Sequence, residues 1–121
     1  MENKREDQDV RATEDYSLAS AASDKFGAQL ETWRKQYSPR PLSVIEVEDK
    51  MIVLRPMTPA VMSQYSMMLA NEGMDVATRY ALNALMLGGD AELIDDDEYF
   101  MVAMMQFATT VELKKGRASK L

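Results

Sequence analysis

All four prolines of this 121-residue chain fall between residues 39 and 59, and they divide it into parts with different backbone conformations. Proline has no backbone N–H and its ring clashes with the preceding helical turn, so no helix can run through Pro39 or Pro41. Pro56 cannot donate to a strand ladder and is expected to end an extended segment. The chain is therefore expected to be extended over residues 42–55, with helices on both sides.

The segment LSVIEVEDKMIVLR, residues 42–55, predicts a β-hairpin because apolar residues alternate along it with the two-residue period of strands. We expect the turn at Asp49-Lys50. A lone hairpin is marginally stable in water, so it is expected to pack against helices. The face toward those helices should carry Ile45, Val47, Ile52 and Leu54.

The part before the prolines is expected to hold one helix and a tail. Residues 24–37 place apolar side chains on one helical face, with Asp24 as the N-cap. Residues 1–23 mix both signs of charge with small side chains and have little to bury. We therefore expect 1–23 to be a flexible charged tail, either disordered or partly helical. The apolar helical face comprises Phe26, Leu30, Trp33 and Tyr37.

Two further helices are predicted after the extended segment. Thr58 as N-cap and Pro59 at the first helical position start the first of them, and Gly73 is expected to end it. Asp75 is expected to cap the second, and Gly88-Gly89 to end it. The expected apolar stripes are Val61, Tyr65, Met68 and Leu69 in the first helix, and Val76, Tyr80, Ala84 and Leu87 in the second.

Six acidic residues lie within residues 90–98, before the last predicted helix. A Ca²⁺ or Mg²⁺ site needs several oxygens converging on one point. An EF-hand loop counted from Asp90 fails, because its fifth position is Ile94 and its sixth is Asp95 rather than glycine. A carboxylate pair for glycoside hydrolysis would need a deep sugar cleft. We favour N-terminal capping, with acids complementing the helix dipole.

The last helix is expected to begin within residues 95–98 and to close at Lys114 and Lys115, before Gly116. Its apolar stripe should comprise Phe100, Met104, Phe107 and Val111. The sequence thus predicts an α+β fold, in which a small β-hairpin packs against three or four helices. We expect a single domain over residues 24–115 and a basic C-terminal tail over 116–121.

Composition excludes several function classes. With no histidine and no cysteine, the usual catalytic triads and zinc or iron–sulfur sites have no ligands or nucleophiles. A net charge of −6 argues against nucleic-acid binding, which needs clustered Lys and Arg. No apolar run approaches the roughly 18 residues of a membrane span, and the charged N-terminus is not expected to be a secretory signal. We expect a non-enzymatic protein with no cofactor, no metal and no membrane partner.

Eleven methionines are the main compositional anomaly. Methionine is flexible and polarizable, so it either fills gaps in a core or forms an adaptable apolar binding surface. A single helical stripe cannot cover both members of the Met67-Met68 and Met104-Met105 pairs. Residues beside the predicted stripes are therefore candidates for contacting a partner or a second copy of the chain. These candidates are Met62, Met67, Met101 and Met105, with Tyr65 at the rim.

The segments LETWRKQY, IEVEDKMIVLRP, TPAVMSQYSMML, ALNALMLGGD, ELIDDDEYF and VELKKGRASKL follow one another along the chain. Their order resembles that in the small tail assembly chaperones of long-tailed bacteriophages. The resemblance covers about residues 28–121, but the long charged N-terminus and the methionine content depart from that family.

The resemblance implies a transient, non-enzymatic role in virion assembly. Such a chaperone in the host cytoplasm would cover the apolar stripes of the helical tape-measure protein until tail-tube subunits polymerise around it. An amphipathic helix lying in an apolar groove is an established mode of recognition. The alternative is a small structural virion protein, such as a connector or head–tail joining ring subunit, which would stay in the particle.

Overall fold

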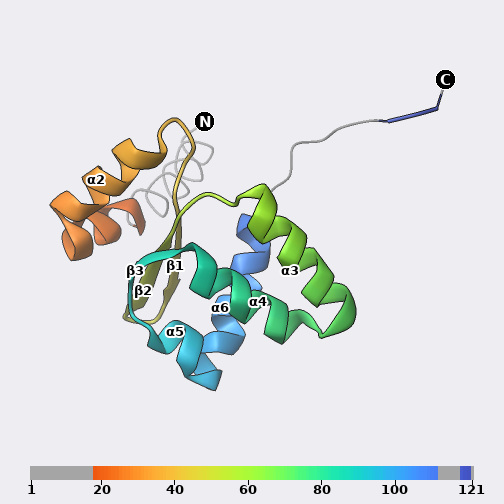
Figure 1. Ribbon diagram of the computed structural model, residues 1–121. Helices are drawn as coiled ribbons and strands as arrows, with labels where there is room; N and C mark the ends of the chain where they lie inside the picture. The colour runs from red at the N-terminus through yellow and green to blue at the C-terminus, as the bar shows by residue number, and fades with distance from the viewer. Residues whose placement is uncertain (1–17, 112–117, 121) are drawn as a thin grey trace, which may run out of the picture.

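A three-stranded antiparallel sheet separates two groups of helices in the computed structural model, which describes residues 18–111 and 118–120 (Figure 1). The strand order is β1-β2-β3. Residues 18–26 are helical. The other elements are α2 (Ala28–Tyr37), β1 (Ser43–Val47), β2 (Lys50–Leu54), α3 (Pro59–Asn71), α4 (Met74–Leu85), β3 (Met86–Gly89), α5 (Glu92–Asp95) and α6 (Asp97–Thr110). The predicted α+β class is confirmed.

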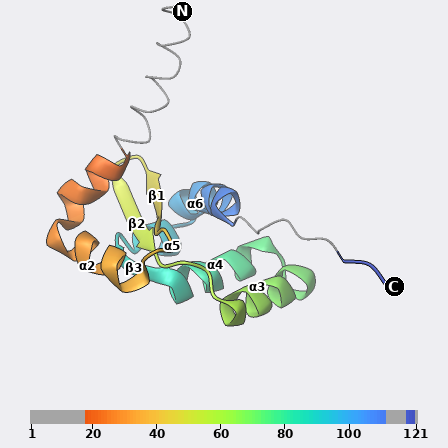
Figure 2. The same cartoon turned by 90° about the horizontal axis from the view of Figure 1, so that it is seen from above.

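Both faces of the sheet are covered by helices (Figure 2). The predicted inner face is confirmed: it packs with α3–α6 into the main core. On the opposite face, Met51 and Val53 pack against Leu30 and Trp33 in a second, smaller core. Residues 18–26 and α2, which we call the N-terminal helical pair, form the layer over that face. The inner-face residues are Ile45, Val47, Ile52 and Leu54.

The hairpin turn lies one residue earlier than predicted. Val47 pairs with Lys50, so the two turn residues are Glu48 and Asp49, and Lys50 already belongs to β2. Glu48 has a positive φ of 57°, as two-residue hairpin turns require at their first central position. Moving a two-residue turn by one position shifts the strand pairing by two residues, and side chains alternate with a period of two. The inner face was therefore predicted correctly, although Ile45 pairs with Ile52 instead of Leu54.

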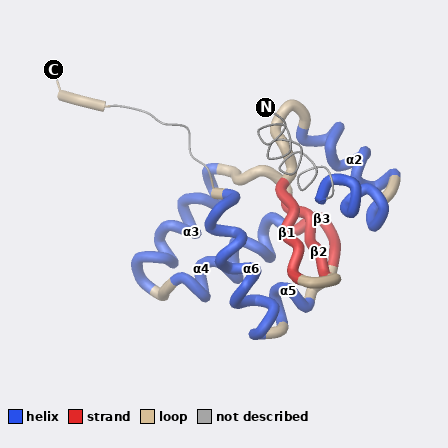
Figure 3. The backbone as a smooth tube through the Cα atoms, turned by 180° about the vertical axis from the view of Figure 1, so that it is seen from behind, coloured by secondary structure: helices blue, strands red, loops and turns tan. Residues whose placement is uncertain are grey.

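The third strand was not predicted. Helix α4 ends at Leu85, and Gly88-Gly89, expected to end that helix, instead lie in β3 (Figure 3). Gly88 pairs with Val53 and Gly89 with Ile52 of β2. Glycine is required here for close approach, since a Cβ at Gly88 would lie 2.7 Å from the Trp33 ring.

The first helix extends further toward the N-terminus than expected. Residues 18–26 are helical and Asp24 lies inside them, so it does not cap a helix. Gly27, at φ +57°, separates this stretch from α2. Ala22 is fully buried in the second core, so residues 18–23, expected to belong to the tail, take part in the fold. The rest of the expected tail, 1–17, lies outside the described residues.

Helix α3 begins as predicted, whereas α4 does not. The Thr58 hydroxyl accepts a hydrogen bond from the Val61 N–H at 3.2 Å, and Pro59 occupies the first turn. Helix α4 has Gly73 at its N-cap with no side-chain cap, so Asp75 lies in the first turn without capping it. The α4 stripe is also displaced, because the buried residues are Ala77, Thr78, Ala81, Leu82 and Leu85.

The displaced stripe reflects how closely α4 packs. Apolar residues cover a broad arc of this helix, opposite a polar side formed by Asp75, Arg79 and Asn83, so the sequence permits two neighbouring stripes. The buried stripe contains alanines 77 and 81, whose small side chains let neighbouring elements approach. Of the predicted stripe, Val76 is exposed, whereas Tyr80 and Ala84 are partly buried at the edge of the main core. Leu87 lies in β3 and packs against the second core.

Helix α6 follows its predicted start and stripe. Phe100 and Phe107 are buried, and Met104 and Val111 pack partly against the main core. The helix ends at Thr110. The lysines and glycine expected to close it, 114–116, lie outside the described residues, as do 117 and 121 of the basic tail.

Candidate functional site

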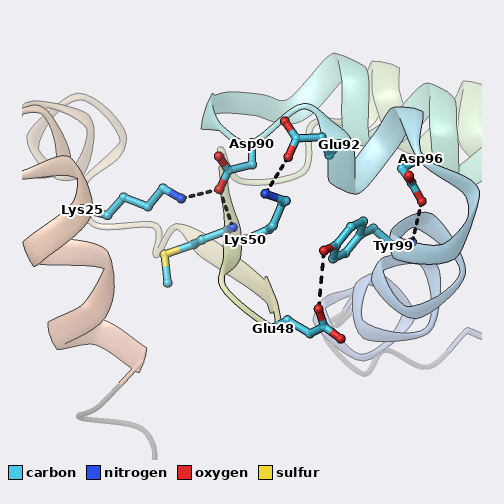
Figure 4. A network of polar contacts seen from close by, with 8 residues as sticks. Lys25, Glu48, Lys50, Asp90, Glu92, Asp96 and Tyr99 are labelled. Atoms are coloured by element: carbon cyan, nitrogen blue, oxygen red, sulfur yellow. Dashed lines mark hydrogen bonds and ion pairs between the residues drawn. The ribbon is translucent and has the colours of Figure 1, made fainter.

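The acidic segment before α6 connects different parts of the fold (Figure 4). Asp90 forms an ion pair with Lys25 of the N-terminal helical pair and accepts a hydrogen bond from the Met51 N–H at 2.9 Å. Glu92 pairs with Lys50 of β2 at 2.8 Å. Through these contacts, Asp90, which follows β3, binds both the hairpin and the N-terminal helical pair, and α5 binds the hairpin.

Three titratable groups in and around this segment, those of Asp90, Lys50 and Tyr99, have shifted pKa values. The Lys25 ammonium and then the Met51 N–H hold the pKa of Asp90 below its ordinary value. The Glu92 carboxylate raises the pKa of Lys50 through a hydrogen bond and charge. Desolvation, followed by the charge of Glu48, raises the pKa of Tyr99, whose hydroxyl lies 3.4 Å from that carboxylate.

The remaining acids of the segment have structural roles too. The Asp96 side chain accepts hydrogen bonds from the N–H groups of Glu98 and Tyr99 and therefore caps α6. This agrees with the predicted helix start within residues 95–98 and the predicted capping role of the acidic segment. Asp97 lies 3.5 Å from the Arg79 guanidinium. Within residues 18–111 and 118–120, no three Asp, Glu, His or Cys side chains are grouped so that they could hold a metal ion.

The Asp90 contacts predict a specific loss of stability in acid. A carboxyl whose folded pKa lies below its ordinary value of 3.8 stabilises the fold fully above that value. This contribution is lost as the pH falls below 3.8 and through the folded pKa. Asp90→Asn should therefore lower the free energy of unfolding at pH 7, and the gap to the wild type should close toward pH 2. Urea denaturation across this range measures the gap.

The matched background for this measurement is Lys25→Gln, which removes the main cause of the shift. In that background the effect of Asp90→Asn at pH 7 should be smaller. A gap between wild type and Asp90→Asn that stays constant from pH 7 to pH 2 would contradict the assigned role of the ion pair.

The five candidate partner-binding residues do not form one surface. Met101 and Met105 are exposed on α6, with 63% and 69% of their area accessible, and Val102 beside them is also exposed. Met101 and Met105 are four residues apart, so they stand on the same side of the helix. We call Met101, Val102 and Met105 the α6 apolar face.

The other three candidates lie on α3 in different surroundings. Met67 is 55% exposed. Met62 is partly buried against the main core. Tyr65 is only 7% exposed and its ring meets Phe107 edge-on at 5.7 Å, so its assignment to a surface rim is wrong. The reason is that Tyr65, like Val61, lies on the buried side of α3, where its ring contacts Phe107 of α6.

Further exposed apolar residues lie near the turn between α3 and α4, and the sequence reasoning did not select them. Leu69 and Val76 were assigned to inner stripes, yet both are exposed, as is Met74. The displaced stripe of α4 accounts for Val76. Reading α4 as buried on its alanine side would have placed Val76 outside the core.

Comparison with known proteins assigns neither a family nor a function to the chain. No protein-family model matches the chain, and neither a curated protein nor a solved structure matches it. In the part of the chain that the structure describes, no helix is both long and apolar enough to cross a bilayer.

Proposed function

We propose that this protein is a non-enzymatic assembly chaperone of a long-tailed bacteriophage and that its α6 apolar face binds a helical segment of the tape-measure protein. The observation that carries the proposal is the exposure of Met101 and Met105 on a helix whose opposite side is already buried in the core. Helix α6 therefore has more apolar surface than the fold of a single chain covers. The order of sequence segments supplies the phage context.

The shape of this face suits an apolar helix as client. Residues four apart on α6 form a short ridge, and ridges of this kind pack into the grooves of a second helix. Methionine side chains adopt many conformations and can fit different apolar partners in turn. A chaperone that covers successive stripes of a long helical chain needs that adaptability, and it needs no catalytic group.

The test is co-purification with the tape-measure protein from cells that express both. Burying one such side chain contributes about 1.5–3 kcal/mol, so Met101→Ser with Met105→Ser should weaken binding by more than tenfold. Both residues are exposed, so the variant should fold as the wild type does. The matched control is Met74→Ser, which removes an exposed methionine from α4. Undiminished capture by the double variant would overturn the assignment of this face.

The chaperone and the structural virion protein differ in whether the protein remains in the mature particle. A chaperone acts in the host cytoplasm and leaves before the tail is complete, so mass spectrometry of purified particles should detect none of it. A fixed number of copies per particle would replace the chaperone proposal with that of a connector or joining-ring subunit.

A further inference from the structure

A second surface, separate from the α6 apolar face, is a groove of about 580 Å³ between the proline-rich segment, the end of β2 and the C-terminal end of α6. This volume falls within the range of ligand-binding clefts. Its apolar lining includes the buried side chains of Leu54, Leu85 and Phe107 and the partly buried Met57 and Met62. We call it the arginine groove.

Within the part of the chain that the structure describes, the charged residues that line the arginine groove are Arg40 and Arg55, and none of its lining residues is acidic. This is unexpected in a chain with 20 acidic and 14 basic residues. Among the described residues, no carboxylate lies within 4.0 Å of either guanidinium. The groove thus combines an apolar wall with positive charge that the described part of the fold leaves without a counter-ion.

Both guanidiniums are held by backbone carbonyl groups. Arg55 donates from Nε and one terminal nitrogen to the Ala84 carbonyl, at 3.2 and 3.0 Å. Arg40 donates to the Met57 carbonyl. A guanidinium has five N–H donors, so each arginine retains donors after these bonds are made. Carboxylates pair with such donors in charge-assisted hydrogen bonds, often two at once.

We propose that the arginine groove binds a peptide segment that carries acidic side chains next to apolar ones. The apolar side chains lie against Met57, Met62 and Phe107, and the carboxylates bind the free donors of Arg40 and Arg55. Charge complementarity selects this occupant over a purely apolar helix. Met62, a predicted partner-binding residue, thereby contacts a partner through this groove and not through the α6 apolar face.

The probe is the peptide acetyl-Gly-Leu-Glu-Leu-Glu-Gly-amide, with the same peptide carrying Gln for Glu as its neutral match. In NMR spectra of protein labelled at the methionine methyl groups, the acidic peptide should shift Met57 and Met62 and leave Met101 and Met105 unchanged. The Gln peptide should bind at least tenfold more weakly. This readout needs no variant, and it distinguishes failure of the groove from failure of the α6 apolar face.

The matched variants each remove one positive charge. Arg40→Gln should raise the Kd of the acidic peptide about tenfold or more, whereas Lys35→Gln, an exposed change on α2, should not alter it. Equal binding of both peptides would show a merely apolar groove and overturn the proposal, as would unshifted Met57 and Met62 at saturating peptide. Shifts of these methyl groups with protein concentration alone would instead assign the groove to a second copy of the chain.

Discussion

Gly89→Ala is expected to lower the free energy of unfolding by about 3 kcal/mol or more, which would leave little of the stability of a small domain. The backbone of Gly89 has φ +125°, a conformation that residues with a side chain rarely adopt. A Cβ there would overlap the Met51 carbonyl oxygen and lie 2.7 Å from the Ile52 Cα. These are backbone atoms of the central strand, so no flexible side chain can move aside.

The consequence should extend beyond β3 itself. Asp90 follows Gly89 directly, and both its backbone N–H and its carboxylate bind the backbone of Met51. Moving the chain away from β2 would break these bonds and the ion pair with Lys25. Urea denaturation monitored by circular dichroism measures the loss.

Gly27→Ala is the matched control. Gly27 also has a positive φ, of +57°, but an added Cβ there would meet nothing within 4 Å. Its backbone, at φ 57° and ψ −131°, is one that residues with a side chain rarely adopt, so this substitution should cost only the backbone strain, about 1–3 kcal/mol. Equal losses from the two substitutions would show that the close approach of β3 to β2 is not what requires glycine.

Trp33→Ala is expected to cost about 3–5 kcal/mol and to release the N-terminal helical pair from the sheet. Trp33 is buried in the second core, against Gly88 and beside the Phe26 ring at a centroid distance of 5.5 Å. That core is small, so removing its largest side chain removes much of its apolar contact. The main core, on the other face of the sheet, loses no side chain.

Hydrogen exchange resolves this effect by region. In Trp33→Ala, amides of α2 should lose most of their protection while those of α6 keep theirs. The control is Tyr37→Ala, which removes a partly buried aromatic residue from the same helix. A uniform loss of protection across both layers would contradict the picture of two separate cores.

Local chemistry made the hairpin faces and two helix starts predictable. The alternation of Ile45, Val47, Ile52 and Leu54 predicted the inner face. Thr58 as N-cap and the acidic residues 95–98 marked the starts of α3 and α6. Each of these signals lies within a few residues of the structure it determines. The prolines acted in the same way, because α2 ends at Tyr37, just before the first of them.

The features that were not predicted from the sequence depend on contacts between residues far apart in the chain. The segment Met86–Gly89 has two glycines and little strand propensity, and it becomes a strand by pairing with β2. Trp33 and the β2 backbone permit this close approach because residues 88 and 89 have no side chain. The arginine groove was missed for a similar reason. Its two arginines are 15 positions apart in sequence and lie at the same end of the hairpin, where Ser43 pairs with Leu54. The rest of the cavity wall comes from helices distant in sequence, through Met62, Leu85 and Phe107.

A methionine-methyl NMR titration of the intact protein tests most directly our proposal that the α6 apolar face binds an apolar helix. The ligand is a synthetic amphipathic helical peptide with one leucine face, and a scrambled peptide of equal composition is the control. We expect the Met101 and Met105 signals to shift with the first peptide alone. Met51, which is 3% exposed, should stay unchanged and report an intact fold. Unshifted Met101 and Met105 signals at saturating peptide, or equal shifts with the scrambled one, would contradict the claim.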